Sequence, residues 1–202
     1  MTRIRPTTRG KIGQMIILYP TDTIYGLGVD ATDPEAVLRL RELKGREDGK
    51  PISIIVSDVG MMERYAEVTP LARKLAERFL PGKLTLILAA RCATSGGCTL
   101  APGIVGEDGS VGVRIPDYPV PLQLVKELGK PITATSANIS GMSTEKTPEK
   151  ILAQFGKKAT MITRIIDAGE LPESTPSTVV DARGDSPVVL REGALSKKFI
   201  DE

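Results

Sequence analysis

Two short motifs carry side chains that suit a phosphate-bearing ligand: Lys44-Gly45-Arg46 and Ser136-Ala137-Asn138. The first supplies two cations, and the second supplies a hydroxyl and an amide. All four groups bind phosphate oxygens when a fold brings them together. The sequence contains no histidine. An imidazole base, a Ser-His-Asp triad and a histidine-ligated metal are therefore excluded.

Both motifs also have a simpler structural explanation. Lys44 and Arg46 follow a predicted helix, where cations complement the negative end of the helix dipole and Gly45 ends the helix. Asn138 caps a polar turn after an apolar strand, a use of asparagine that requires no ligand. The residues alone leave both roles open for each motif.

Further polar residues stand at the predicted ends of strands. Residues 19–28 place hydroxyls, a carboxylate and glycines at a sheet edge, where α/β proteins commonly bind ligands, although a capped turn explains them equally well. Arg114 and Arg191 are placed either to clamp an anion through two hydrogen bonds or to form surface ion pairs. Ser177 presents a hydroxyl to a ligand or starts the strand that follows it.

The elements that must position these residues are a mixture of strands and helices. Apolar runs predict strands at 14–19, 51–57, 84–89, 111–115, 131–135, 161–167, 178–181 and 188–191. Helical spacing and proline-containing caps predict helices at 34–43, 70–79, 119–128 and 147–156. The last strands follow without helices between them. We therefore expect a single α/β domain with a twisted mixed parallel and antiparallel sheet and flanking helices.

The size and charge of the chain limit its domain count and its partners. Its 202 residues, 41% of them hydrophobic, suit one domain over 14–202 after an irregular basic segment at 1–13. The net charge of +2 is too small to predict a nucleic-acid or membrane partner. Four cations of the first segment nevertheless allow contact with RNA phosphates, or simply form a solvated terminus: Arg3, Arg5, Arg9 and Lys11.

No apolar run approaches the ~20 residues of a membrane span, and no signal-peptide region is present, so we expect a cytoplasmic protein without a membrane partner.

Residues 91–110 form a glycine-rich loop, either a binding lid or a passive excursion. Cys92 and Cys98 lie in this loop, where two thiols without histidine cannot complete a tetrahedral zinc site. We expect free thiols there rather than a disulfide.

Taken together, the motifs resemble the YrdC-like family, the threonylcarbamoyl-adenylate synthases. The matching segments extend in order over residues 16–196: PTDTIYGLG, KGR before KPISIIVSD, PGKLTLIL, VGVRIPDYP, TATSANISG, PSTVVD and LREGAL. The resemblance implies a twisted sheet with a basic concave face. It also implies a nucleotidyltransferase that condenses L-threonine, bicarbonate and ATP into threonylcarbamoyl-AMP and releases pyrophosphate. This reaction is the first step of threonylcarbamoyladenosine modification of tRNA.

The same resemblance implies partners and residue roles. Mg²⁺ is expected to arrive with ATP rather than on protein ligands, a transferase is expected to receive the product, and direct tRNA binding is left open. The implied catalytic and ATP-binding residues are Lys44, Arg46, Ser136 and Asn138, with Ser177 and Arg191 as further ATP contacts. The implied threonine contacts are Thr23, Tyr25, Arg114 and Ser177.

The chain departs from the family pattern in three places. Many members carry a histidine near the position of Ile55 that helps to hold threonine, and this sequence has none. The usual N-terminal helix is replaced by a segment in which Pro6 and Gly10 disfavour a helix. The additional C-terminal domain of longer relatives is not expected here.

Two other functions compete with this interpretation. A non-catalytic double-stranded RNA or tRNA-binding module would use the same cations on phosphates. Aromatic residues make up only 3% of the chain and supply little surface for base stacking, which disfavours recognition of single strands. A carbamoyl-adenylate enzyme of hydrogenase maturation uses a related domain, but it carries further domains and requires carbamoyl phosphate.

Overall fold

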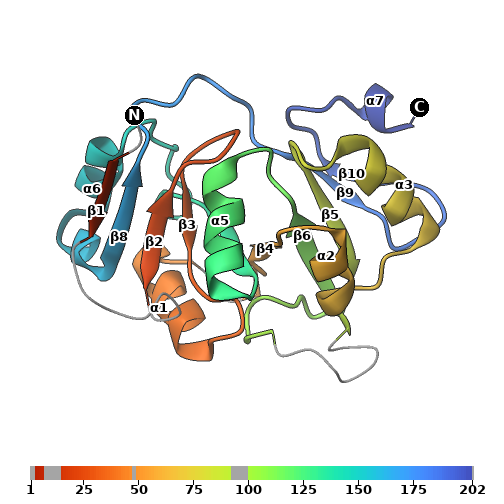
Figure 1. Ribbon diagram of the computed structural model, residues 1–202, viewed down its shortest axis with the longest axis horizontal. Helices are drawn as coiled ribbons and strands as arrows, with labels where there is room; N and C mark the ends of the chain where they lie inside the picture. The colour runs from red at the N-terminus through yellow and green to blue at the C-terminus, as the bar shows by residue number, and fades with distance from the viewer. Residues whose placement is uncertain (1–2, 7–14, 47–48, 92–99, 202) are drawn as a thin grey trace.

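The computed structural model describes residues 3–6, 15–46, 49–91 and 100–201. Its ten strands form one sheet in the order β1-β8-β2-β3-β7-β4-β6-β5-β9-β10, with helices packed around them (Figure 1). Three neighbouring pairs, β2–β8, β4–β6 and β5–β9, are parallel, and the other six are antiparallel. The expected α/β fold with a mixed sheet is confirmed.

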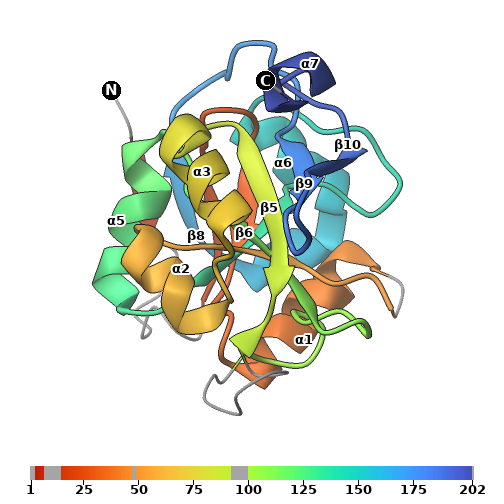
Figure 2. The same ribbon diagram turned by 90° about the vertical axis from the view of Figure 1, so that its right-hand side faces the viewer.

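The bounds of the strands are β1 Arg3–Pro6, β2 Ile16–Tyr19, β3 Gly26–Gly28, β4 Ser53–Ile55, β5 Leu84–Ala89, β6 Ser110–Arg114, β7 Ile132–Ser136, β8 Ile162–Asp167, β9 Thr178–Asp181 and β10 Val188–Arg191. The bounds of the helices are α1 Pro34–Lys44, α2 Val59–Tyr65, α3 Pro70–Phe79, α5 Pro119–Leu128, α6 Pro148–Phe155 and α7 Lys197–Asp201, with a 3₁₀ helix at Gly156–Met161. Figure 2 shows α2, α3 and α5 together on one side of the sheet.

The prediction of an irregular N-terminal segment is wrong for its described part. Residues 3–6 form β1, an edge strand that pairs antiparallel with β8, Arg3 lying opposite Asp167. Pro6 is compatible with this position, because an edge strand tolerates a residue without a backbone N–H group. Residues 3–6 contain no alternating apolar pattern from which this strand could have been predicted.

The strand β3 was also missed, because its sequence is Gly-Leu-Gly. The aromatic ring of Tyr19 on β2 explains both glycines. A Cβ atom built on Gly28 would lie 2.7 Å from this ring, and one on Gly26 would lie 3.0 Å from it. Glycine is therefore required by close packing here, although it has a low intrinsic preference for strands.

The end of α1 sets the direction of its last two cations. Asp33 caps the helix by accepting hydrogen bonds from the N–H groups of Glu35 and Ala36. The helix ends at Gly45, whose φ of 57° is left-handed, as the sequence predicted. Lys44 is the last residue of the helix and its side chain is buried. Arg46 comes after the cap residue and therefore lies outside the helix.

Sheet pairing brings the ends of the central strands together. Gly26 of β3 lies opposite Ser136 of β7, and Ile55 of β4 lies opposite Arg114 of β6. Apolar side chains from both halves of the sheet form one continuous core. Within the described residues, no helix combines the length and the apolarity needed to cross a membrane.

Candidate active site

Most of the side chains predicted for the site line one cavity of about 280 Å³, here called the central cavity. They are Thr23, Tyr25, Arg46, Arg114, Ser136, Ser177 and Arg191. A neighbouring cavity of about 320 Å³, the turn cavity, is lined by Lys44, Gly45, Arg46, Lys50, Ser136, Asn138, Ser140 and Gly141. Arg46 and Ser136 line both cavities, so the two cavities adjoin each other. The structure therefore gathers every predicted site residue around two adjoining cavities.

Arg114 organises one end of the central cavity. Its Nη2 forms an ion pair with Asp22 Oδ1 at 2.5 Å, and its Nη1 donates to Thr23 Oγ1 at 3.1 Å. Burial lowers the pKa of Arg114 from its ordinary value, and the carboxylate of Asp22 opposes that decrease. The guanidinium thus stays in one orientation beside Thr23, which is where an anionic group of a small substrate would be held.

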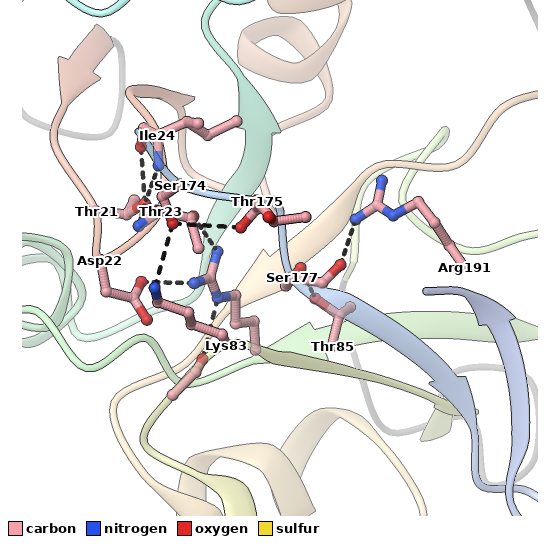
Figure 3. A network of polar contacts seen from close by, with 12 residues as sticks. Thr21, Asp22, Thr23, Ile24, Lys83, Thr85, Ser174, Thr175, Ser177 and Arg191 are labelled. Carbon is pink, nitrogen blue, oxygen red and sulfur yellow. Dashed lines mark hydrogen bonds and ion pairs between the residues drawn. The ribbon is translucent and has the colours of Figure 1, made fainter. Parts of the chain in front are cut away.

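Asp22 was not among the predicted site residues. The sequence carried one signal for it, a carboxylate in the same turn as Thr23. The ion pair with Arg114 could not be predicted from the sequence, because the two residues are 92 positions apart in the chain. Figure 3 shows Asp22 and Thr23 side by side in this polar network.

Hydrogen bonds within the chain fix the turn that carries these residues. Thr21 Oγ1 accepts from the N–H groups of Thr23 and Ile24 at 3.1 and 3.2 Å and donates to Ile24 O at 2.7 Å. The Tyr25 hydroxyl donates to Gly169 O and accepts from the N–H group of Ala168, both at 2.9 Å. Burial raises the pKa of Tyr25 to about 12, so this hydroxyl remains protonated at neutral pH.

Ser177 lines the central cavity, just before β9. Its hydroxyl shares a hydrogen bond with Thr85 Oγ1 at 2.8 Å, and its carbonyl accepts from Arg191 Nη2 at 2.8 Å (Figure 3). Arg191 therefore secures the backbone that presents Ser177. Both residues line the cavity, as the sequence predicted.

The turn after β7 is held by its own side chains. Ser136 Oγ donates to Asn138 Oδ1 at 2.5 Å, and Asn138 Nδ2 donates to Met142 O at 2.6 Å. Lys44 Nζ donates to the carbonyl oxygen of Ser136 and, at 2.7 Å, to that of Asn138. The side chain of Lys44 is thus directed at the turn after β7, and the phosphate contact that the resemblance implies for it stays a prediction.

Arg46 lies at the junction of the two cavities. Its Nε donates to Lys50 O at 3.2 Å and its Nη2 donates to Pro51 O at 2.9 Å, so the backbone after α1 orients the guanidinium. Burial and the nearby charge of Arg41 lower the pKa of Arg46 from its ordinary value. An arginine stays charged even so, and Arg46 is suited to bind an anion.

Ile55, named above as one of the departures from the family pattern, lines the wall of the central cavity. Its side chain is buried and apolar. Polar side chains that line the same cavity include Thr23, Arg114 and Ser177.

The donors around the cavities suit an anion better than a metal ion. They are guanidinium groups, hydroxyls and an amide, whereas Mg²⁺ prefers carboxylate and carbonyl oxygens. Within the part of the chain that the structure describes, no group of three or more Cys, Asp or Glu side chains is placed to hold a metal. Cys92 and Cys98 lie outside the described residues, as do all of residues 92–99 of the loop 91–110. Its described end is anchored by Ile104, which is buried.

Comparisons with known proteins agree with this architecture. The Sua5/YciO/YrdC family model, described as "Telomere recombination", matches residues 12–193. A putative threonylcarbamoyl-AMP synthase of Methanocaldococcus jannaschii is 38% identical over 181 residues, which is 89% of this chain and 80% of that protein. The threonylcarbamoyl-AMP synthase of Bacillus subtilis is 34% identical, over 92% of this chain and 52% of that protein.

Solved structures show the same fold. The crystal structure of Pyrococcus abyssi Sua5 complexed with L-threonine has a TM-score of 0.82 and 36% identity, covering 93% of this chain and 53% of that one. Escherichia coli YciO has a TM-score of 0.79 and 30% identity, covering 93% and 87%. This chain spans about half the length of the Bacillus and Pyrococcus relatives. Because the family model and these relatives match most of its length, the chain belongs to the Sua5/YciO/YrdC family.

Proposed function

We propose that this protein is an L-threonylcarbamoyl-AMP synthase, which condenses L-threonine, bicarbonate and ATP and releases pyrophosphate. One observation carries the proposal. The central cavity places Arg46 and Ser136, suited to a nucleotide, in the same space as Arg114 and Thr23, suited to an amino acid. Family membership and the activity named for the relatives support the same assignment.

The reaction needs no nucleophile from the protein. The neutral amine of threonine attacks carbon dioxide, or bicarbonate with loss of water, and forms a carbamate. A carbamate oxygen then attacks the α-phosphorus of ATP, and the bond to the β-phosphate oxygen breaks as pyrophosphate leaves. Holding the two substrates in line and neutralising the developing charge supply most of the acceleration in such transfers. A site without histidine is therefore sufficient.

The residues divide this work between the two ends of the cavity. Arg46 faces the triphosphate, and Ser136, Asn138, Ser177 and Arg191 line the nucleotide side. The threonine carboxylate is held by Arg114, with Thr23 and Ser177 beside it, while Tyr25 fixes the backbone of this end. Mg²⁺ bound to the phosphate oxygens supplies further charge neutralisation when present. We extend the proposal to a basic concave face, a cytoplasmic location, a transferase that takes the product, and contact with tRNA.

Mass spectrometry of the products tests this function. The protein is incubated with ATP, bicarbonate and Mg²⁺ and with each amino acid in turn. We expect threonylcarbamoyl-AMP and pyrophosphate with L-threonine, and much less product with serine or glycine. An RNA-binding module would give no product with any amino acid. A product that forms only with carbamoyl phosphate would instead identify a carbamoyl-adenylate enzyme.

A further inference from the structure

Lys44 is the most deeply buried charged residue that the structure describes, with 1% of its surface exposed. Its side chain extends from the end of α1 to the turn after β7. The residues that it contacts there are 92 and 94 positions further along the chain. There Nζ donates to Ser136 O, to Asn138 O at 2.7 Å and to Asn138 Oδ1 at 3.4 Å. The backbone oxygen of Lys44 also accepts from the N–H group of Ser140 at 2.8 Å.

These contacts satisfy an ammonium group without a ligand. An ammonium has three N–H donors, and three oxygen atoms of the turn lie within reach of Nζ. To contact a phosphate, Lys44 would have to give up at least one of these oxygens. That exchange would leave a buried carbonyl without its donor, which is unfavourable.

The turn, in contrast, depends on this lysine. The carbonyl oxygens of Ser136 and Asn138 both accept hydrogen bonds from Lys44 Nζ. The third oxygen near Nζ is Asn138 Oδ1, which also accepts from Ser136 Oγ. The buried Nζ of Lys44 therefore lies at the centre of the hydrogen bonds that orient the two side chains predicted to bind the nucleotide. The segment 136–142 is called the nucleotide turn below.

We propose that Lys44 is a positioning residue, whose Nζ fixes the nucleotide turn through its carbonyl groups, and that Arg46 rather than Lys44 contacts the triphosphate. The identity of the ligand rests on the proposed function, but the position of Lys44 does not. The two cations of the Lys-Gly-Arg motif thus have different roles, one in positioning the turn and one in binding the triphosphate. Lys44, before Gly45, donates to the carbonyl groups of the turn, and Arg46, after it, lines both cavities.

Chemical labelling of the unmodified protein tests the position directly. The wild-type protein is treated with an amine-reactive reagent, with and without inorganic tripolyphosphate, and the labelled peptides are identified by mass spectrometry. We expect Lys44 to remain unlabelled under both conditions, whereas Lys130, whose side chain is 51% exposed, is labelled in both. Labelling of Lys44 in the free protein, with protection by tripolyphosphate, would overturn the proposal.

Two variants separate positioning from ligand contact. Lys44→Met keeps the length of the side chain and removes its donors, and Arg46→Ala removes the proposed phosphate contact. Hydrogen exchange is measured in the ligand-free protein, and binding of tripolyphosphate is measured by calorimetry. We expect Lys44→Met to accelerate exchange at the Ser140 amide by about tenfold or more, and Arg46→Ala to weaken tripolyphosphate binding without changing that exchange.

Native exchange in the nucleotide turn of Lys44→Met, together with weakened tripolyphosphate binding, would contradict the proposal. If Lys44→Met does not fold, the labelling of the wild-type protein still decides the question. Neither measurement requires turnover. A failure of the proposed function, seen as absence of the threonine-dependent product, is therefore distinguishable from a failure of this inference.

Discussion

Asp22 and Arg114 form a buried ion pair in which Oδ1 and Nη2 lie 2.5 Å apart and each side chain is 9% exposed. The other carboxylate oxygen, Asp22 Oδ2, is buried and has no hydrogen-bond partner. Removing one member of a buried pair is costly, because the remaining charge is left without compensation. Asp22 thus orients the guanidinium group of Arg114, which donates to Thr23 and is proposed to bind the carboxylate of threonine.

Replacing Asp22→Asn removes this charge while keeping the shape of the side chain. We expect the free energy of unfolding to fall by about 3 kcal/mol, because Arg114 loses its ion-pair partner in a buried position. We also expect KM for threonine to rise about tenfold, the equivalent of a single lost charged contact, with a smaller change in KM for ATP. Urea unfolding and steady-state kinetics measure both effects. Asp185→Asn, an exposed control, should leave both unchanged; equal KM values in Asp22→Asn and the wild type would contradict the role of the pair.

Gly193→Ala should disturb the proposed nucleotide site through the backbone. A Cβ atom at Gly193 would lie 2.2 Å from Pro176 O and 2.7 Å from the carbonyl carbon of Ser177. The segment before β9 must then move, and Ser177 moves with it. We expect kcat/KM for ATP to fall by about tenfold and stability to fall by roughly 1–3 kcal/mol. Gly184→Ala is the matched control, because nothing lies within 4 Å of its added Cβ. Similar kinetics in the two variants would show that Ser177 does not depend on this contact.

The stability contributed by Lys44 should depend on pH. Burial, and to a lesser extent the charge of Arg46, lower the pKa of Lys44 to about 7, whereas in the unfolded chain it has its ordinary value of 10.5. Between these two values the unfolded state binds more protons than the folded state, so stability rises with pH. We expect the difference in free energy of unfolding between the wild type and Lys44→Met to be constant below pH 7. Above it, this difference should increase by up to about 1.4 kcal/mol per pH unit in favour of the wild type. A flat difference from pH 7 to pH 10 would show that Lys44 keeps its proton in the folded protein.

The sequence predicted the fold well where the local signals agree with the tertiary contacts. β5, β9, β10 and α5 have the bounds that their apolar patterns and caps indicated. The C-terminal end of α1 was predicted for the same reason, because Gly45 supplies the conformation that the helix end requires. Local pattern and final structure carry the same information in these segments.

The remaining features depend on contacts between distant residues. β3 is a strand because the Tyr19 ring leaves no room for a side chain, and nothing in Gly-Leu-Gly itself indicates this. The sequence motifs likewise predicted that Lys44 and Asn138 belong to one site. They did not determine whether the amino group of Lys44 contacts a ligand or the protein. That choice is made by the burial of α1 and by two carbonyl groups in the turn after β7.

In the proposed function, Arg46 holds the triphosphate in the same cavity that receives threonine. The rate of threonine-dependent pyrophosphate release from ATP is measured for the wild type and for Arg46→Ala. We predict that the variant is slower by ~10² or more, the scale of a lost charged contact to the transition state. Arg73→Ala, which alters a surface arginine outside the cavities, should retain the wild-type rate. Unchanged pyrophosphate release in Arg46→Ala would contradict this account.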